Sequence, residues 1–253
     1  MTVRAVALVQ VDVKRQWRLQ SMLGHLAVAK DLGADLAVFP EAFPFWQSRT
    51  RALRMEDATD RLAALACPPD LAFVAGGYVL DKEDQLRNAA FLVSSGRRVR
   101  HYFKRKAWRG GTGGERRPGP YGIHEGTEAV VFRWRGGSCL PLICSDVFGQ
   151  SAGDQAAHEQ WLRRELAPFR EEAPDLVVVP SYPKAPTGKR WCAMLRLAAA
   201  VLDRPVAFCS VAGHDESGFG GGGSAVYFPD GTRSPAPPPR TSGVFVIELP
   251  QRA

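Results

Sequence analysis

The stretch Asp35-Leu-Ala-Val-Phe-Pro-Glu41 is a short apolar run that ends in a proline and a carboxylate. Its length and composition predict a buried strand. It follows residues 16–32, in which Leu and Ala recur at helical spacing and Gly33 stands just beyond the end. Residues 3–11 form an apolar run that predicts a first strand. The chain therefore opens as strand, helix, strand, an order typical of sheets covered by helices.

The same alternation continues to the end of the chain. Residues 129–134 and 139–144 are expected to pair as a hairpin around Gly136-Gly137. The remaining elements are expected as a helix at 51–66, strands at 71–80, 88–94 and 99–104, a helix at 154–170, a strand at 175–180, a helix at 188–202, and strands at 205–211, 224–228 and 244–249. No composition break divides the chain. The pattern predicts an α/β fold of two packed β-sheets flanked by helices, an α-β-β-α sandwich, in a single domain over residues 1–253.

Composition and charge narrow the class of protein. Apolar residues make up 45% of the chain and charged residues 23%, which is ordinary for a globular protein. No apolar run approaches the roughly 20 residues of a membrane span, and the first ten residues lack the pattern of a signal peptide. The net charge of +7 raises the question of nucleic-acid binding, but the arginines are scattered and no binding motif accompanies them. We expect a cytoplasmic protein that binds neither membranes nor nucleic acids.

The cysteines are odd in number, which argues against a disulfide framework. There are five, at positions 67, 139, 144, 192 and 209, and no Cys-x-x-Cys motif occurs. The five histidines show no metal-ligand spacing. Each cysteine is by default a small buried hydrophobic residue in a reducing compartment. One of them could instead be a nucleophile.

Three sites at predicted strand ends carry the chemistry. Glu41 directly follows an apolar strand, so its carboxylate is partly desolvated, as suits a general base. In Tyr102-Phe-Lys-Arg-Lys106, a lysine could stabilise an oxyanion, but strand alternation places Lys104 and Lys106 on the same side and does not separate them. Cys144, in Leu140-Pro-Leu-Ile-Cys-Ser-Asp146, follows an apolar strand as a nucleophile on a sharp turn would. Taken singly, each residue could equally be a turn acid, an exposed base or a core thiol.

Taken together, the ordered set Phe39-Pro-Glu41, Tyr102-x-Lys104 and Ile143-Cys-x-Asp146 resembles the nitrilase-like carbon–nitrogen hydrolase superfamily. The resemblance runs from Ala5 to Ile247 and includes Asp175-Leu-Val-Val-Val-Pro-Ser181, Trp191, Gly222-Gly-Ser224 and Pro229-Asp-Gly231. It implies a Glu41–Lys104–Cys144 triad, selects Lys104 over Lys106, and indicates the amidase-type branch. It also suggests Glu125 as a fourth catalytic residue, in preference to Glu115.

The resemblance implies a thioester mechanism that needs no metal or cofactor. Cys144 would attack an amide carbonyl, and Lys104 and the backbone N–H of Ser145 would stabilise the oxyanion. The product would be ammonia or an amine. Phe45, Trp46, Trp108 and Tyr182 are candidates to line the substrate pocket, although core packing would explain such residues too. The family commonly assembles as homo-oligomers, so at least a homodimer is expected.

One departure from the family bears on the substrate. Many amidase and carbamoylase members carry an arginine shortly after Cys-x-Asp, whereas this chain has Cys144-Ser-Asp-Val-Phe-Gly149. Such an arginine can bind a substrate carboxylate, so N-carbamoyl amino acids and α-keto acid amides are disfavoured unless an arginine elsewhere takes its place. Hydrolysis of nitriles or N-carbamoyl groups by the same triad stays open. So do glutamine-dependent ammonia supply to a partner and a non-enzymatic role on this fold.

Overall fold

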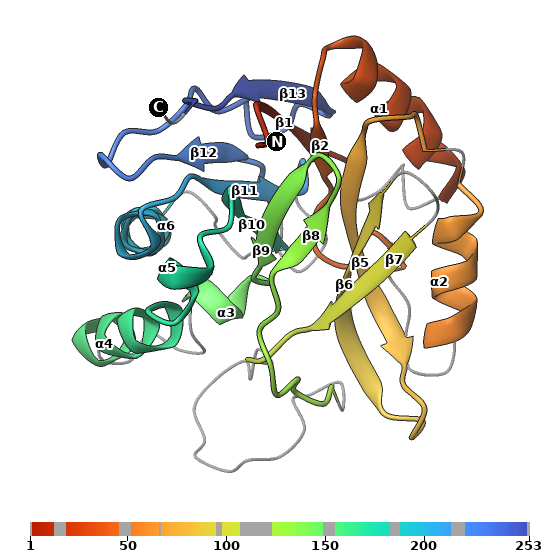
Figure 1. Cartoon of the computed structure of the whole chain (residues 1–253), viewed down its shortest axis with the longest axis horizontal. Helices are drawn as coiled ribbons and strands as arrows, with labels where there is room; N and C mark the ends of the chain where they lie inside the picture. The colour runs from red at the N-terminus through yellow and green to blue at the C-terminus, as the bar shows by residue number, and fades with distance from the viewer. Residues whose placement is uncertain are drawn as a thin grey trace.

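The structure, a computed structural model, describes residues 2–12, 19–45, 52–65, 67–94, 98–106, 123–148, 155–182, 188–213 and 221–251. Two β-sheets pack face to face, and helices cover the outer face of each (Figure 1). This is the α-β-β-α sandwich that the sequence predicts.

The first sheet has the strand order β13-β1-β2-β5-β6-β7. The inner strands β1, β2 and β5 are parallel, while β13 and the meander β5-β6-β7 are antiparallel. Two short strands, β3 and β4, also pair with β5 in parallel. The bounds are β1 Ala5–Gln10, β2 Leu36–Val38, β3 Pro44–Phe45, β4 Leu53–Arg54, β5 Ala72–Leu80, β6 Leu86–Ser94, β7 Arg98–Phe103 and β13 Gly243–Glu248.

The second sheet has the order β12-β11-β10-β9-β8. Its three central strands are parallel, and each outer strand is antiparallel to its neighbour. The bounds are β8 Phe132–Trp134, β9 Gly137–Pro141, β10 Leu176–Ser181, β11 Val206–Ser210 and β12 Ala225–Tyr227. Because parallel strands end at the same edge, both sheets bring their carboxyl ends to one side of the sandwich.

Helices α1 (Leu19–Asp31) and α2 (Met55–Ala63) cover the first sheet, and α4 (Gln155–Leu166) and α6 (Lys189–Leu202) lie on the side of the second (Figure 1). Two short helices, α3 (Ser145–Phe148) and α5 (Phe169–Glu172), complete the described elements. Within the described residues, no helix is long and apolar enough to cross a membrane.

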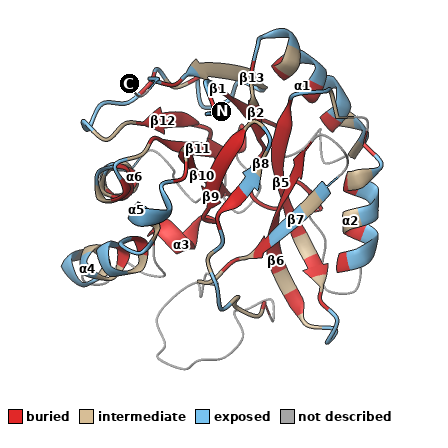
Figure 2. Ribbon diagram, viewed as in Figure 1, coloured by how far each residue is buried: buried red, intermediate tan, exposed pale blue. Residues whose placement is uncertain are grey.

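Alternation along the strands divides the core into two layers. On β1, Val6 and Leu8 pack between the sheets, whereas Ala7 and Val9 face the layer that α1 and α2 cover. Figure 2 shows the central strands buried along their length. These strands are apolar on both faces because each face is covered, as expected for parallel strands.

Three expected elements differ in the structure. The helix expected at 51–66 begins only at Met55, because Leu53 and Arg54 pair with β5 as strand β4. The helix expected at 154–170 is two helices, because Pro168 has no N–H for an α-helical hydrogen bond and α4 ends before it. The strand expected at 139–144 ends at Pro141. Its hairpin turn is Arg135-Gly136 rather than Gly136-Gly137, since Gly137 pairs with Trp134.

Candidate active site

Three strand ends bring the predicted triad together. Glu41 lies three residues beyond β2, Lys104 directly follows β7, and Cys144 lies three residues beyond β9. All three side chains are buried in the interior between the sheets' carboxyl ends, with 5%, 4% and 7% of their residues' surface exposed. Ionisable groups are rarely this buried unless they are paired, so their partners decide what the site can do.

The Glu41 carboxylate is held by hydrogen bonds to both oxygens. Its Oε1 accepts from Lys104 Nζ at 2.5 Å and from Asn88 Nδ2 at 2.7 Å. Its Oε2 accepts from the backbone N–H of Tyr182 at 3.0 Å. The turn that carries Glu41 packs closely on Gly76 of β5, where a Cβ atom would lie 3.3 Å from the Ala42 nitrogen. Glycine at that position lets the turn approach the sheet.

Lys104 is fixed at both its backbone and its side chain. Its N–H donates to the Asn88 carbonyl at 2.8 Å, and its carbonyl accepts from Gly126 N–H at 2.8 Å. Burial by itself lowers the pKa of the Lys104 ammonium, but the negative charges nearby, Glu41 first, outweigh it and raise the pKa above its ordinary value. Lys104 is therefore a permanent positive charge in the site.

The neighbouring lysine has a different environment. Lys106 is half-buried, and its Nζ lies 4.9 Å from the centre of the Trp161 ring. Because β7 ends at Phe103, strand alternation no longer applies to residues 104–106. The structure thus places Lys104, not Lys106, against Glu41.

Cys144 lies on a sharp turn. Its φ of 45° is in the left-handed region, which costs a non-glycine residue about 1–3 kcal/mol and is common at functional sites. Its N–H donates to Pro180 O at 3.1 Å, and α3 begins at the next residue. Burial and the Glu41 charge raise the pKa of the thiol to about 12, although Lys104 and a hydrogen bond from the Tyr182 N–H oppose the shift. The resting side chain is therefore a thiol.

Asp146 ties the lysine segment to the cysteine turn. Its Oδ2 accepts from the Tyr102 hydroxyl at 2.7 Å and from Ile143 N–H at 2.8 Å. Its Oδ1 accepts from the N–H groups of Arg105 and Lys106 at 3.0 and 2.8 Å. Four hydrogen bonds to one buried carboxylate fix the spacing between the end of β7 and Cys144.

The other candidate residues are divided between the site and its surroundings. Ser145 is buried, and its hydroxyl donates to Lys106 O. Tyr182 is buried beside Glu41 through its N–H. Phe45 is a core residue that meets Phe91 edge-on, with ring centres 6.5 Å apart. Trp46 and Trp108 lie outside the described residues, as do Glu115 and much of the loop that follows β7.

The backbone of the segment that contains Glu125 lies beside Lys104. Its carbonyl accepts from Arg87 Nη1 at 2.5 Å, and the following residue, Gly126, bonds to Lys104 O. A Cβ on Gly126 would lie 2.5 Å from Phe103 O, so glycine allows this segment to pack on the end of β7. A catalytic role for the Glu125 carboxylate stays a prediction.

Sequence reasoning missed two residues that hold the site. Asn88 binds Glu41 through its side chain and Lys104 through its carbonyl. Asp146 was noticed only as part of a motif. Asn88 gave one usable signal, because it is an amide in a strand, β6, whose other buried residues are mostly apolar. A buried polar residue of that kind needs a partner.

The arrangement combines a carboxylate, a fixed cation and a thiol in a buried site. Such a set can move a proton, form a covalent bond and stabilise an anion. Within the described ranges, no three His, Cys, Asp or Glu side chains gather as metal ligands would.

Solved structures share this fold. A cysteine-to-serine variant of the Nesterenkonia AN1 amidase from the nitrilase superfamily has a TM-score of 0.74 at 21% identity, covering 98% of this chain and 92% of that chain. A glutamate-to-glutamine variant of the same amidase gives the same score and identity, covering 98% and 91%. In that structure the acetamide moiety of fluoroacetamide is covalently added at the active-site cysteine. The fold is thus that of nitrilase-superfamily amidases.

The sequence comparisons go one step further. The carbon-nitrogen hydrolase family model matches residues 3–253, so this chain belongs to the carbon–nitrogen hydrolase family. It is 28% identical over 191 residues to the Omega-amidase YafV of Escherichia coli (strain K12), over 74% of this chain and 65% of that relative. The chain therefore spans less than two thirds of the length of the curated relatives it matches.

Proposed function

We propose that this protein hydrolyses a non-peptide amide-type C–N bond of a small molecule through a thioester on Cys144. The observation that carries the proposal is the buried Glu41–Lys104 ion pair beside the Cys144 thiol. Family membership supports the reaction class. The geometry supports the division of labour among the three residues.

Acylation begins with the thiol rather than a thiolate, because the pKa of Cys144 is raised to about 12 by burial and the Glu41 charge. Glu41 takes the thiol proton as sulfur attacks the carbonyl carbon. The developing oxyanion is stabilised by the Lys104 ammonium and the N–H of Ser145. Glu41 then gives the proton to the leaving nitrogen, the C–N bond breaks, and ammonia or an amine departs.

Deacylation uses the same base. Glu41 takes a proton from water, the resulting hydroxide attacks the thioester, and the C–S bond breaks. The sulfur regains its proton and the carboxylic acid leaves. Glu125, on the segment bonded to Lys104, is proposed to orient the lysine or the attacking water.

The substrate class that we favour is a primary amide of a small organic acid. The relatives' names support it, since one is an omega-amidase and the structural neighbours are amidases. The absence of an arginine after Asp146 removes one means of binding a substrate carboxylate next to the nucleophile. The alternative substrates are nitriles, N-carbamoyl compounds and glutamine, and their turnover is to be compared with that of other small amides.

The proposal includes a homodimer or higher homo-oligomer in the cytoplasm. All five cysteines are free, which suits a reducing compartment. Light scattering on the purified full chain measures the assembly directly, and a monomer at micromolar concentration would contradict it.

Intact-mass spectrometry tests the reaction. The full chain is incubated with short aliphatic amides, glutamine, ureas and nitriles, and ammonia release is measured in parallel. We expect an acyl adduct on Cys144 whose mass identifies the acid, and none in C144A. Ammonia release from amides by C144A at the wild-type rate would refute the mechanism, and release from nitriles alone would refute the substrate class.

A further inference from the structure

A second hollow lies at the opposite end of β7 from Lys104. Its volume is about 510 Å³, and four arginines line it. We call it the arginine groove: Arg98 and Arg100 on β7, Arg133 on β8, and Arg135 in the turn that follows β8. Arg100 lies four positions before Lys104 along β7, and Arg98 lies six, so the groove begins roughly 13 Å from the triad lysine and extends away from it. It is not part of the candidate active site.

The β7 arginines stand on the inner face of the first sheet. In the register of β6 and β7, Arg100 is opposite Leu92, just as Tyr102 is opposite Ala90. Leu92, Ala90 and Tyr102 all belong to the core between the sheets. Arg98 and Arg100 therefore continue an apolar row, at the corner where the second sheet ends with β8. Both arginines are exposed there.

Among the described residues that line it, the groove gathers positive charge and has no carboxylate. Its other lining residues are Leu92, Ser94 and Trp134. Within the described residues, Arg98, Arg100 and Arg135 make no ion pair or side-chain hydrogen bond. Arg133 bonds to the backbone carbonyl of Glu172 at 3.0 Å, and that residue's carboxylate is 3.9 Å away.

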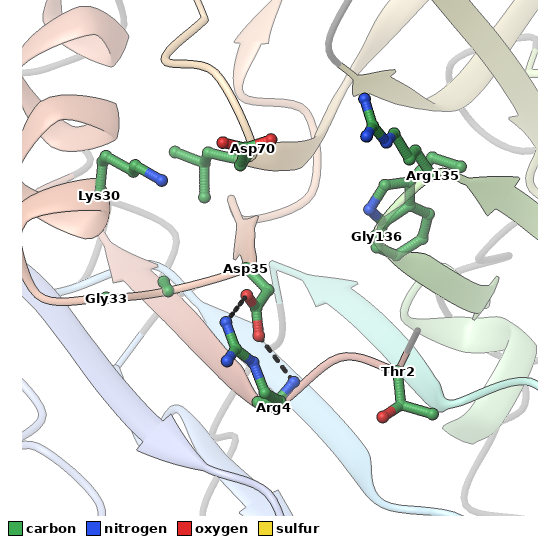
Figure 3. Close-up of a pocket in the computed structure, with 11 residues that line it drawn as sticks. Thr2, Arg4, Lys30, Gly33, Asp35, Asp70, Arg135 and Gly136 are labelled. Atoms are coloured by element: carbon green, nitrogen blue, oxygen red, sulfur yellow. Dashed lines mark hydrogen bonds and ion pairs between the residues drawn. The ribbon is translucent and has the colours of Figure 1, made fainter.

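An adjoining hollow of about 610 Å³ shares Trp134 and Arg135 with the groove. Figure 3 shows Lys30 and Arg135 on opposite sides of it, with Asp70 between them. In the same view, Arg4 is already paired with Asp35, at 3.2 Å. The adjoining hollow thus carries charges of both signs, whereas the described lining of the arginine groove carries positive charge alone.

Edge strands often carry charges that prevent pairing with another chain. That role needs only a charge of either sign on each strand. It does not explain four arginines gathered from two strands and a turn in one hollow, three of which have no anionic partner among the described residues; their mutual repulsion favours a bound anion. Guanidinium groups present planar forks that bind phosphate oxygens in pairs.

We propose that the arginine groove binds a small molecule that carries several phosphate groups. Closely spaced phosphates concentrate three or four negative charges in a volume of this size, which a single carboxylate does not. Trp134, half-buried at the junction of the two hollows, offers an apolar wall to the organic part of such a ligand.

Calorimetric titration of the full chain with inorganic triphosphate tests the proposal. We expect one site per chain, weakened about tenfold or more in the double variant R98A/R100A. The control is R163A/R164A, which removes two exposed charges from α4 and leaves the groove intact. ATP is a second probe, and we expect it to bind more tightly than triphosphate if Trp134 contacts the organic part.

Four outcomes would overturn the proposal. These are no binding at low salt, equal weakening in both double variants, and tighter binding of a DNA oligonucleotide that triphosphate does not displace. The fourth is a dimer that R98A/R100A dissociates without any anion binding. Because the site is remote from Cys144, amide hydrolysis by R98A/R100A should equal that of the wild type, which also shows that the variant is folded.

Discussion

The cationic side chains at the two ends of strand β7 lie in opposite environments. At the carboxyl end, Lys104 is buried and its ammonium is bonded to the Glu41 carboxylate at 2.5 Å. At the amino end, Arg98 and Arg100 are exposed in a hollow where no carboxylate stands among the described lining residues. A buried cation needs a partner from the protein, because desolvation is otherwise too costly. An exposed cation can leave that partner to solvent or to a ligand.

The largest effect is expected when the counter-charge of Lys104 is removed at the buried end of β7. In E41A the Lys104 ammonium loses its counter-charge while it remains buried, which should lower the free energy of unfolding by about 3–5 kcal/mol. Turnover should be lost as well. R98A removes a charge from the exposed end and should change stability by less than about 0.5 kcal/mol.

Urea unfolding of the two variants measures this difference. E41Q is the companion variant, since it keeps the side-chain volume and shows whether charge alone matters. Similar stabilities for E41A and R98A would mean that the ion pair contributes nothing to folding.

The next effect concerns the connection between the lysine segment and the cysteine turn. In D146N an amide NH₂ replaces one carboxylate oxygen and faces two donors, which should cost about 1–3 kcal/mol of stability. Because the spacing of Lys104 and Cys144 depends on this carboxylate, kcat should fall too.

The matched control for that variant is D175N. Asp175, directly before β10, accepts hydrogen bonds from the backbone N–H and the hydroxyl of Ser138 on β9, away from the site. The D175N variant should therefore be less stable than the wild type but have an unchanged kcat. A D146N enzyme with unchanged kcat would show that Asp146 serves the fold alone.

A substitution at Asn88 tests the contribution of a single hydrogen bond at the buried end of β7. N88A removes the 2.7 Å bond to Glu41 while leaving the Lys104 ion pair in place. A hydrogen bond to a charged group contributes about 1.5–3 kcal/mol, so kcat should fall tenfold or more with little change in KM.

Steady-state kinetics on the best amide substrate measures this effect. N88D should not restore the rate, because it places a second carboxylate beside Glu41 and Lys104. Full activity in N88D would contradict a positioning role for the amide.

The smallest expected effect is a pH dependence. The thiol form of Cys144 is favoured in the folded protein, since burial raises its pKa from 9.0 to about 12. Alkylation of Cys144 by iodoacetamide should therefore keep rising about tenfold per pH unit beyond pH 9. A plateau at or below pH 9, measured by peptide mass spectrometry, would show that Lys104 outweighs burial.

The same shift has a consequence for stability. A raised pKa in the folded state stabilises the protein fully below pH 9 and loses that contribution as pH rises from 9 through about 12. C144A lacks the titrating thiol, so its stability should fall less than that of the wild type between pH 8 and pH 10.5.

Much of the fold could be predicted because its signals are local. The apolar runs before Glu41 and Cys144, and the helical spacing before Gly33, each depend on neighbouring residues. The break at Pro168 was missed although its cause is also local, since proline lacks the N–H that a continuous helix requires. Although β9 ends at Pro141, the chain beyond it still bonds to β10, from Leu142 N–H to Val178 O and from Cys144 N–H to Pro180 O.

The sequence by itself determined the two-sheet architecture and placed a glutamate, a lysine and a cysteine at strand ends. Periodicity and short motifs carry that information. The family motif also selected Lys104 over Lys106, which strand alternation alone did not separate. Only the tertiary structure decided that Asn88 and Asp146 hold the site and that four arginines share one hollow. Those facts depend on contacts between residues that are distant in the chain, and only the packing of the two sheets sets them.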